Sequence, residues 1–371
     1  MKRYWTMITL DYLSHWSVTN AVREYISNAL DSPAPFEYEI GDDYVVLTSK
    51  GITLPPTIFA MGYSQNRKDS SAVGQFGEGA LVSMVPIMRE DKTLEIFNGN
   101  VVWTPAFEYN EDLGVEVLVI RELPLVEGTN DYSVKISGLT SDEIEEITNN
   151  CIYFRKDLGE VLDGSTGSII KGFKGKLFVG GIFVTDIGSN YEYSFNFKPE
   201  HLPLNRDRKS VESFDLARQT SILIKELIDP VEIAKLVEQR KPEVASLHHR
   251  SELLPIAEAC YENLVEKYGD DVVVCQWYDD QEKLEKQGYK NVVNVSHGNY
   301  YDILVQSSRY KDKLAELTED LPEGELEEEL EPLEMLEAWY DAQSLNISEA
   351  SAKEFNELLD IFRDRGLKWE D

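Results

Sequence analysis

The stretch Val18–Asp31, VTNAVREYISNALD, decides how the first part of this chain folds. Its apolar residues recur at three- and four-residue spacings, which predicts an amphipathic helix with one face on a core: Val18, Ala21, Val22, Tyr25, Ile26, Ala29 and Leu30. Glu24, Asn28 and Asp31 fall together on the opposite face. A carboxylate and an amide one turn apart can hold a metal ion and a water molecule, whereas a solvated polar face is the simpler interpretation of these three residues alone.

A second informative stretch is glycine-rich and precedes another expected helix, which begins near Ala80 in ALVSMVPIM. It reads Gly74-Gln75-Phe76-Gly77-Glu78-Gly79. Glycines at this spacing allow the backbone to approach phosphate oxygens closely. The stretch is not a Walker A loop, because no GK[ST] follows, and it is not a Rossmann loop, because a long polar segment precedes it instead of a strand.

The composition narrows the classes of function. The 371 residues carry a formal net charge of -32, from 68 acidic and 36 basic side chains, and such a surface repels polyanions. Direct nucleic-acid binding is therefore not expected, and the charge suits either a highly soluble protein or one whose partner is basic. The three cysteines are far apart and lack a CxxC pair, which is typical of free thiols in a reducing compartment. With no apolar stretch long enough for a signal or a membrane span, we expect a cytoplasmic protein without membrane contact.

The pattern of strands and helices predicts an α+β chain with four parts. Residues 1–155 combine the two motifs with strand-like segments, namely FEYEI, YVVL, TLEIFNG, NVVWTPAFEY, GVEVLVIREL and YSVKISGL. Residues 156–245 contain further strands and a long helix expected over Ser213 to Arg240. Residues 246–312 read as a small α/β unit. Residues 313–371 form an acidic linker and helical tail, in which 8 of the 14 residues from Glu319 to Pro332 are acidic.

The two motifs together resemble a known group of enzymes. An ExxxNAxD helix followed about fifty residues later by GxFGxG before a second helix is similar to the GHKL ATPase superfamily, which contains gyrase B subunits, Hsp90 chaperones, histidine kinases and MutL-type proteins. The resemblance covers about residues 14–245 and has the Hsp90-like domain order; a compact acidic chain of this kind also resembles the ATPase part of phage rIIA-like proteins. It implies an N-terminal Bergerat-fold α/β sandwich domain, an α/β middle domain like the family's transducer domain, and ATP and Mg²⁺ as cofactors.

The resemblance also implies roles for individual residues. Glu24 matches the general base that orients the attacking water, Asn28 matches the Mg²⁺ ligand, and Asp31 matches a supporting acidic position of the N box. The G2 box, which contacts the phosphates, is matched by Gly74, Gln75, Phe76, Gly77 and Gly79. Such a set suits phosphoryl transfer, which needs a positioned water and charge neutralisation more than covalent help.

One motif departs from the family pattern. The G1 box is DxGxG, and its Asp bonds the adenine amino group, but the matching place here reads Leu47-Thr48-Ser49-Lys50-Gly51-Ile52. Gly51 is kept and no Asp is present, so we expect Thr48 to accept the hydrogen bond from the base, directly or through water. Gly128-Thr129 before YSVKISGL resembles the family's late GT strand, whose Thr also faces adenine; a simple turn residue is the alternative interpretation of Thr129.

A further residue is expected to come from the second part of the chain. EHLPLNRDRKSV, residues 200–211, resembles the Hsp90 middle-domain segment that supplies a catalytic arginine to the γ-phosphate. Arg208 takes that place, with Arg206 as the alternative and Asn205 three residues before Arg208. A surface loop paired through Asp207 is the simpler interpretation. An arginine from a second domain would couple hydrolysis to domain closure.

The sequence therefore predicts a Mg²⁺-dependent ATPase whose lid and domains rearrange around a protein client or host factor, in the manner of a chaperone or regulatory ATPase. A nucleotide-dependent homodimer is the expected assembly. The alternative is a nucleotide-binding or degenerate GHKL module that acts as an acidic protein-interaction or DNA-mimic factor without turnover. The absent G1 Asp favours the alternative, whereas Glu24, Asn28 and Arg208 favour the ATPase.

Overall fold

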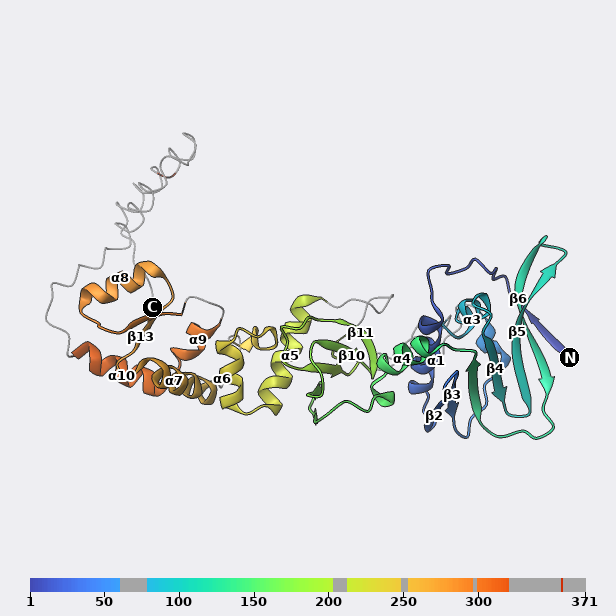
Figure 1. The fold of residues 1–371 in the computed structure, drawn as a ribbon, viewed down its shortest axis with the longest axis horizontal. Helices are drawn as coiled ribbons and strands as arrows, with labels where there is room; N and C mark the ends of the chain where they lie inside the picture. The colour runs from blue at the N-terminus through green and yellow to red at the C-terminus, as the bar shows by residue number, and fades with distance from the viewer. Residues whose placement is uncertain (61–78, 203–211, 248–252, 296–298, 320–354, 356–371) are drawn as a thin grey trace.

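The computed structural model describes residues 1–60, 79–202, 212–247, 253–295, 299–319 and Phe355. Its parts follow one another along the long axis of the molecule (Figure 1): a large sheet at one end, a smaller sheet in the middle, and a mainly helical part at the other end. The chain therefore has the mixed α+β character that its sequence predicts.

The first part is built on a seven-stranded sheet with the order β1-β6-β5-β4-β7-β3-β2, in which all neighbouring strands are antiparallel. The expected strands are all present, and β1 is an addition. The strands are β1 (Lys2–Trp5), β2 (Phe36–Ile40), β3 (Tyr44–Ser49), β4 (Thr93–Asn98), β5 (Val101–Asn110), β6 (Val115–Pro124) and β7 (Tyr132–Ser137).

Helices cover one face of this sheet. They are α1 (Val18–Leu30), α2 (Gly79–Val82), α3 (Met84–Arg89) and α4 (Ser141–Asn149), with a 3-10 turn η1 (Pro56–Phe59). The apolar face of α1 shares one core cluster with α2, α3 and the inward side chains of β3, β4 and β7. Ser17 caps α1 by accepting from the Asn20 amide, which explains why the helix begins where the sequence predicts. The single helix expected near Ala80 is present as two short ones, α2 and α3.

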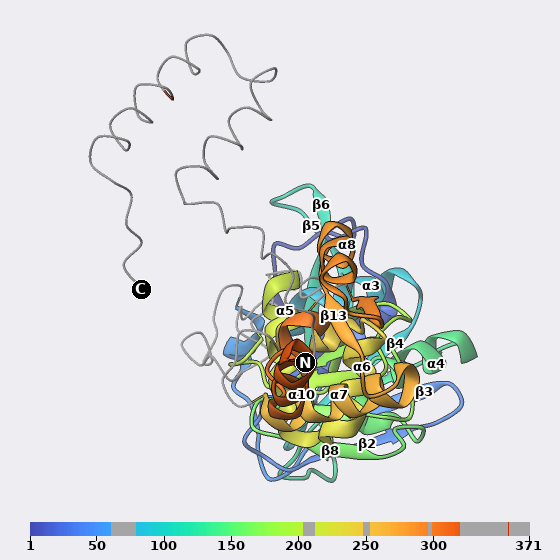
Figure 2. The same ribbon diagram turned by 90° about the vertical axis from the view of Figure 1, so that its left-hand side faces the viewer.

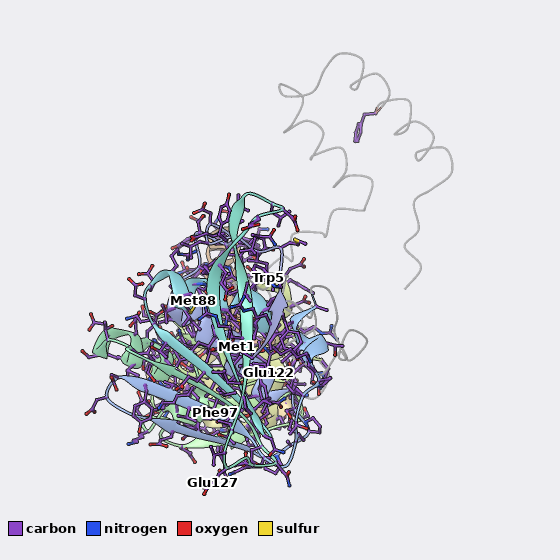
Figure 3. The ribbon with its side chains drawn as sticks, turned by 90° about the vertical axis from the view of Figure 1, so that its right-hand side faces the viewer. Met1, Trp5, Met88, Phe97, Glu122 and Glu127 are labelled. Carbon is purple, nitrogen blue, oxygen red and sulfur yellow. The ribbon has the colours of Figure 1, made fainter. Side chains whose placement is uncertain are left out.

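One carboxylate, Glu122, holds the outer edge of the sheet; Figure 3 labels this residue. Glu122 on β6 accepts hydrogen bonds from the Tyr4 hydroxyl at 2.6 Å and from Trp103 Nε1 at 2.9 Å. The bond from Trp103 and then that from Tyr4 lower the pKa of Glu122, because both stabilise the ionised form. These contacts bind β1 to the strands beside it.

The middle part contains a five-stranded sheet with the order β11-β10-β12-β9-β8, in which β10 and β12 are parallel. Its strands are β8 (Val161–Asp163), β9 (Gly167–Ile170), β10 (Lys176–Val179), β11 (Ile182–Asp186) and β12 (Ser194–Phe197). The single helix expected over Ser213 to Arg240 is two helices, α5 (Ser213–Leu227) and α6 (Pro230–Glu238). Pro230 causes the break, since proline cannot continue a helix but suits its first turn, and Asp229 caps α6.

The last described part contains α7 (Leu254–Tyr268), β13 (Val273–Cys275), α8 (Tyr278–Gln287), β14 (Val292–Asn294), α9 (Tyr300–Leu304) and α10 (Ser308–Glu319), and β13 and β14 pair in parallel. A single core cluster runs from the middle sheet through α5 and α6 to α7 and α10. The residues on both sides of the expected 245/246 boundary therefore share a core, and the 312/313 boundary falls inside α10.

Aromatic and backbone contacts join the first and middle parts. Cys151 forms a β-bridge with Ile182, which belongs to the core cluster of the first part. In the 3-10 turn η2 (Ile152–Phe154), the Phe154 ring lies 4.4 Å from that of Tyr38, whose hydroxyl donates to the Tyr153 carbonyl. Within the described residues, no helix is both long and apolar enough to cross a membrane.

A buried carboxyl in the middle part gives a pH-dependent prediction. Glu243, in the 3-10 turn η3 (Pro242–Val244), is fully buried and accepts the Glu192 amide at 2.6 Å through Oε1. Its Oε2 has no hydrogen-bond partner in the described part of the chain. Burial raises the pKa of Glu243 above its ordinary 4.5, although the Lys241 charge acts in the opposite direction. The folded state therefore holds this proton more tightly than the unfolded state.

We expect the stability that this proton provides to be complete below about pH 4.5, the ordinary pKa of the group, and to be lost as the pH rises through the raised pKa of folded Glu243. Each unit by which the folded pKa exceeds the unfolded one contributes about 1.4 kcal/mol to the free energy of unfolding at low pH. Glu243→Gln keeps an oxygen for the Glu192 amide and removes the titration. Urea unfolding at several pH values should show a flatter stability profile for Glu243→Gln than for wild type, with the exposed Glu266→Gln as control. Identical profiles for wild type and Glu243→Gln would show that this carboxyl titrates normally.

Candidate functional site

The polar face of α1 is oriented as the sequence predicts. Glu24 is partly exposed and Asn28 is exposed, whereas the apolar stripe of the same helix is buried. Asp31 lies at the end of the helix as its C-cap, and its backbone amide donates to the Ser27 carbonyl. Glu24 and Asn28, one turn apart, are therefore presented together on the side of α1 that faces away from the core.

The end of the glycine-rich motif lies directly against this face. Gly79 is the first residue of α2, and a Cβ atom added to it would lie 2.6 Å from Oε2 of Glu24, closer than real Cβ contacts. The next residue continues the contact, since the Tyr25 hydroxyl donates to the Ala80 carbonyl at 2.8 Å. The fold thus brings together Glu24 and Gly79, which are 55 residues apart, and a side chain at position 79 would require the Glu24 carboxylate to move from this place.

The last residue of β3 is a buried serine. Val45, Leu47 and Ser49 alternate as the buried side of β3, and Ser49 is only 3% exposed. Thr48 faces the opposite side of the sheet, where its hydroxyl lies 2.8 Å from that of Ser133. The expected contact of Thr48 with a base stays a prediction, and in this structure the partner of its hydroxyl is Ser133. Ser49, two residues before Gly51, takes the inward position.

The loop after β3 is held by two residues that the motif analysis missed. Gly51 has a φ of 71°, a conformation that favours glycine, and its amide donates to Asp131 Oδ1 at 2.9 Å. This bond and the Lys50 ammonium lower the pKa of Asp131. Asn98 bonds both the amide and the carbonyl of Leu54, at 2.8 and 2.9 Å. The loop is thereby fixed to the ends of β4 and β7.

Thr129 is exposed in the turn before β7 and is used within that turn. Its amide donates to the Gly99 carbonyl at 3.1 Å, and its hydroxyl accepts from the Asp131 amide at 3.2 Å. This turn lies beside Gly51 through their shared partner Asp131, and the expected contact of Thr129 with adenine stays a prediction.

Several expected site residues lie outside the described residues. These are Gly74, Gln75, Phe76 and Gly77 of the glycine motif, and Arg208 with its neighbours Asn205 and Arg206. Their predicted roles stay predictions.

The described site contains few side chains that could bind a metal ion. Over the described part of the chain, no group of three or more His, Cys, Asp or Glu side chains could hold a metal ion. A divalent cation at this place would depend on Asn28, whose amide oxygen is a ligand of the hard type that Mg²⁺ prefers, and on oxygens of the nucleotide itself. Burial raises the pKa of both Tyr25 and Tyr132 at this side of the sheet, which keeps both hydroxyls protonated as hydrogen-bond donors.

Comparison of the chain with models of protein families and with curated proteins finds no match. An assignment to a family is therefore a proposal that depends on the motifs and on the geometry that joins them.

Proposed function

We propose that this chain is a GHKL-type ATPase that binds Mg²⁺ and ATP between α1, the glycine motif and the adjacent end of the large sheet. The contact of the Glu24 carboxylate with Gly79 carries this proposal. A carboxylate held against the last glycine of a phosphate-binding motif lies where it could orient a water molecule toward a terminal phosphate. The helix-covered antiparallel sheet is compatible with a Bergerat fold.

The roles follow from the chemistry of each side chain. Bound Mg²⁺-ATP would supply the phosphoryl group and much of the charge neutralisation. Glu24 would orient and deprotonate the attacking water, and Asn28 would hold the metal through its amide oxygen. Gly79, together with Gly74 and Gly77, would bring backbone amides close to the phosphates. Arg208 would add a positive charge to the γ-phosphate from the second part of the chain.

This site would recognise the nucleotide base differently from a site in which a G1 carboxylate bonds the adenine amino group. Ser49 occupies the inward position at the end of β3, and a hydroxyl can both donate and accept a hydrogen bond. Asp131 lies nearby, but its two oxygens already accept from the Gly51 amide and the Lys50 ammonium. We therefore propose a purine site with weaker preference for adenine than a G1 carboxylate would give.

A working cycle would couple this site to a protein partner. Closure of the segment between Gly51 and Gly79 over the nucleotide, followed by rearrangement of the middle part, is the proposed output. The net charge of -32 favours a basic protein client over nucleic acid. Pairing of two chains in the nucleotide-bound state belongs to the same proposal.

The proposal is tested by ATP hydrolysis of wild type and Asn28→Ala at varied Mg²⁺ concentration. We expect measurable turnover by wild type and a loss of about 10- to 100-fold in Asn28→Ala, since a contact with a charged group contributes roughly 1.5–3 kcal/mol. Asn20→Ala, on the same helix, is the matched control and should retain activity. Equal Mg²⁺ dependence in all three proteins would remove Asn28 from the site.

A second candidate function is favoured by the serine at position 49. Without a carboxylate there, the chain could be a nucleotide-binding module that captures a basic protein and performs no turnover. Nucleotide binding without hydrolysis in wild type would support this alternative over the ATPase.

A further inference from the structure

Two adjacent aromatic side chains are exposed far from the proposed nucleotide site. Trp277 and Tyr278 follow β13 directly and are 62% and 76% exposed. They belong to the β13–α8–β14 unit at the opposite end of the molecule from the large sheet (Figure 1). Exposed aromatic rings of this size leave much apolar surface in water, and aromatic residues are enriched where proteins bind partners.

The folding of this unit does not account for the two rings. Helix α8, which begins at Tyr278, has no buried residue, and Trp277 precedes it without a side-chain capping bond. The core of this part is instead made by residues on β13, α7, α9 and α10, such as Val274, Leu264, Ile303 and Tyr310. In Figure 2, which views this end of the molecule, α8 is drawn above β13.

Two carboxylates follow the aromatic pair on the same helix. Asp279 and Asp280 lie in the first turn of α8. This helix begins after β13, which pairs in parallel with β14. Carboxyl ends of parallel strands are where α/β units commonly bind ligands.

We propose that Trp277, Tyr278, Asp279 and Asp280 form a docking corner for a lysine- and arginine-rich segment of a partner protein. Cationic side chains would lie on the two aromatic rings while their charges are neutralised by the two aspartates. Charge complementarity selects this occupant. The acidic segment from Glu319 to Pro332 of the same chain, and any nucleic acid, would be repelled by the aspartates.

The probe is a fluorescein-labelled synthetic peptide of repeated Gly-Lys-Arg units, titrated with the full chain and followed by fluorescence anisotropy, with no nucleotide present. A Gly-Ser-Glu peptide of the same length and a single-stranded oligonucleotide are compared. We expect saturable binding of the basic peptide only, weakened by added salt. Tighter binding of the oligonucleotide, or no binding of the basic peptide, would overturn the proposal.

Matched variants distinguish the contribution of the docking corner to peptide binding from that of the chain's overall negative charge. Trp277→Ala/Tyr278→Ala leaves the net charge unchanged and should weaken binding at least tenfold, whereas Tyr109→Ala/Phe214→Ala removes two exposed rings elsewhere and should not. Asp279→Asn/Asp280→Asn should weaken binding more than Asp42→Asn/Asp43→Asn, which changes the net charge equally. Equal effects within either pair would overturn the proposal. So would basic-peptide binding that appears only after residues 320–371 are removed, because the corner would then be occupied by the chain's own tail.

Discussion

Glu24→Gln should abolish nearly all ATP turnover while leaving nucleotide affinity within a few-fold of wild type. Glutamine has the size of glutamate and keeps the contact with Gly79, but it cannot take a proton from water. General-base catalysis contributes about 10²- to 10⁴-fold, so kcat should fall by that factor. Single-turnover hydrolysis of radiolabelled ATP, together with a binding titration of the same protein, measures the two quantities separately.

The matched control for Glu24→Gln is Glu145→Gln, an exposed carboxylate on α4, which should keep wild-type kcat. Equal loss of affinity and turnover in Glu24→Gln would mean that Glu24 holds the nucleotide and does not activate water. Unchanged turnover would remove Glu24 from the mechanism.

The second large effect is expected from Gly79→Ala. The new methyl group would lie 2.6 Å from Oε2 of Glu24, so the carboxylate must move away. A displacement of about 1 Å at a catalytic group can cost about 10²-fold in rate. Position 79 begins α2, and alanine suits a helix better than glycine, so the unfolding free energy should change by no more than about 1 kcal/mol. Steady-state hydrolysis by Gly79→Ala measures the loss of rate, and urea unfolding of the same variant measures the change in its free energy of unfolding.

A double variant shows whether Gly79 acts through Glu24. If the methyl group works by displacing the carboxylate, Gly79→Ala should cause little further loss in a Glu24→Gln background. Independent, multiplicative losses in the double variant would mean that Gly79 contributes by another route, such as direct contact of its backbone with phosphate.

Local patterns in the sequence predict local structure well. The apolar spacing of Val18–Asp31 specifies α1, and the alternating segments specify strands β2 to β7, because burial of one face sets both periodicities. The same alternation in YVVLTS could have identified Ser49 as the inward residue, since Val45 and Leu47 precede it at two-residue spacing. Thr48 occupies the alternate register, with its side chain on the other side of the strand beside Ser133.

Long-range pairings could not be read from the sequence. Asp131 is 80 residues from the Gly51 amide that it binds, and Asn98 is 44 residues from Leu54. Neither pair belongs to a local motif, so only the register of β3, β7 and β4 shows that they meet. The same applies to the shared core across residues 245 and 246, which depends on the packing of α6 against α7.

Isothermal titration of the wild-type chain with ATP and with GTP, each with and without Mg²⁺, tests the central claim most directly. We predict saturable binding that is strengthened by Mg²⁺, with ATP and GTP affinities that differ by less than about tenfold, because Ser49 presents a hydroxyl in place of a carboxylate. Absence of binding by either purine nucleotide, in a protein whose cooperative unfolding shows that it is folded, would contradict the assignment of α1 and the glycine motif to a nucleotide site.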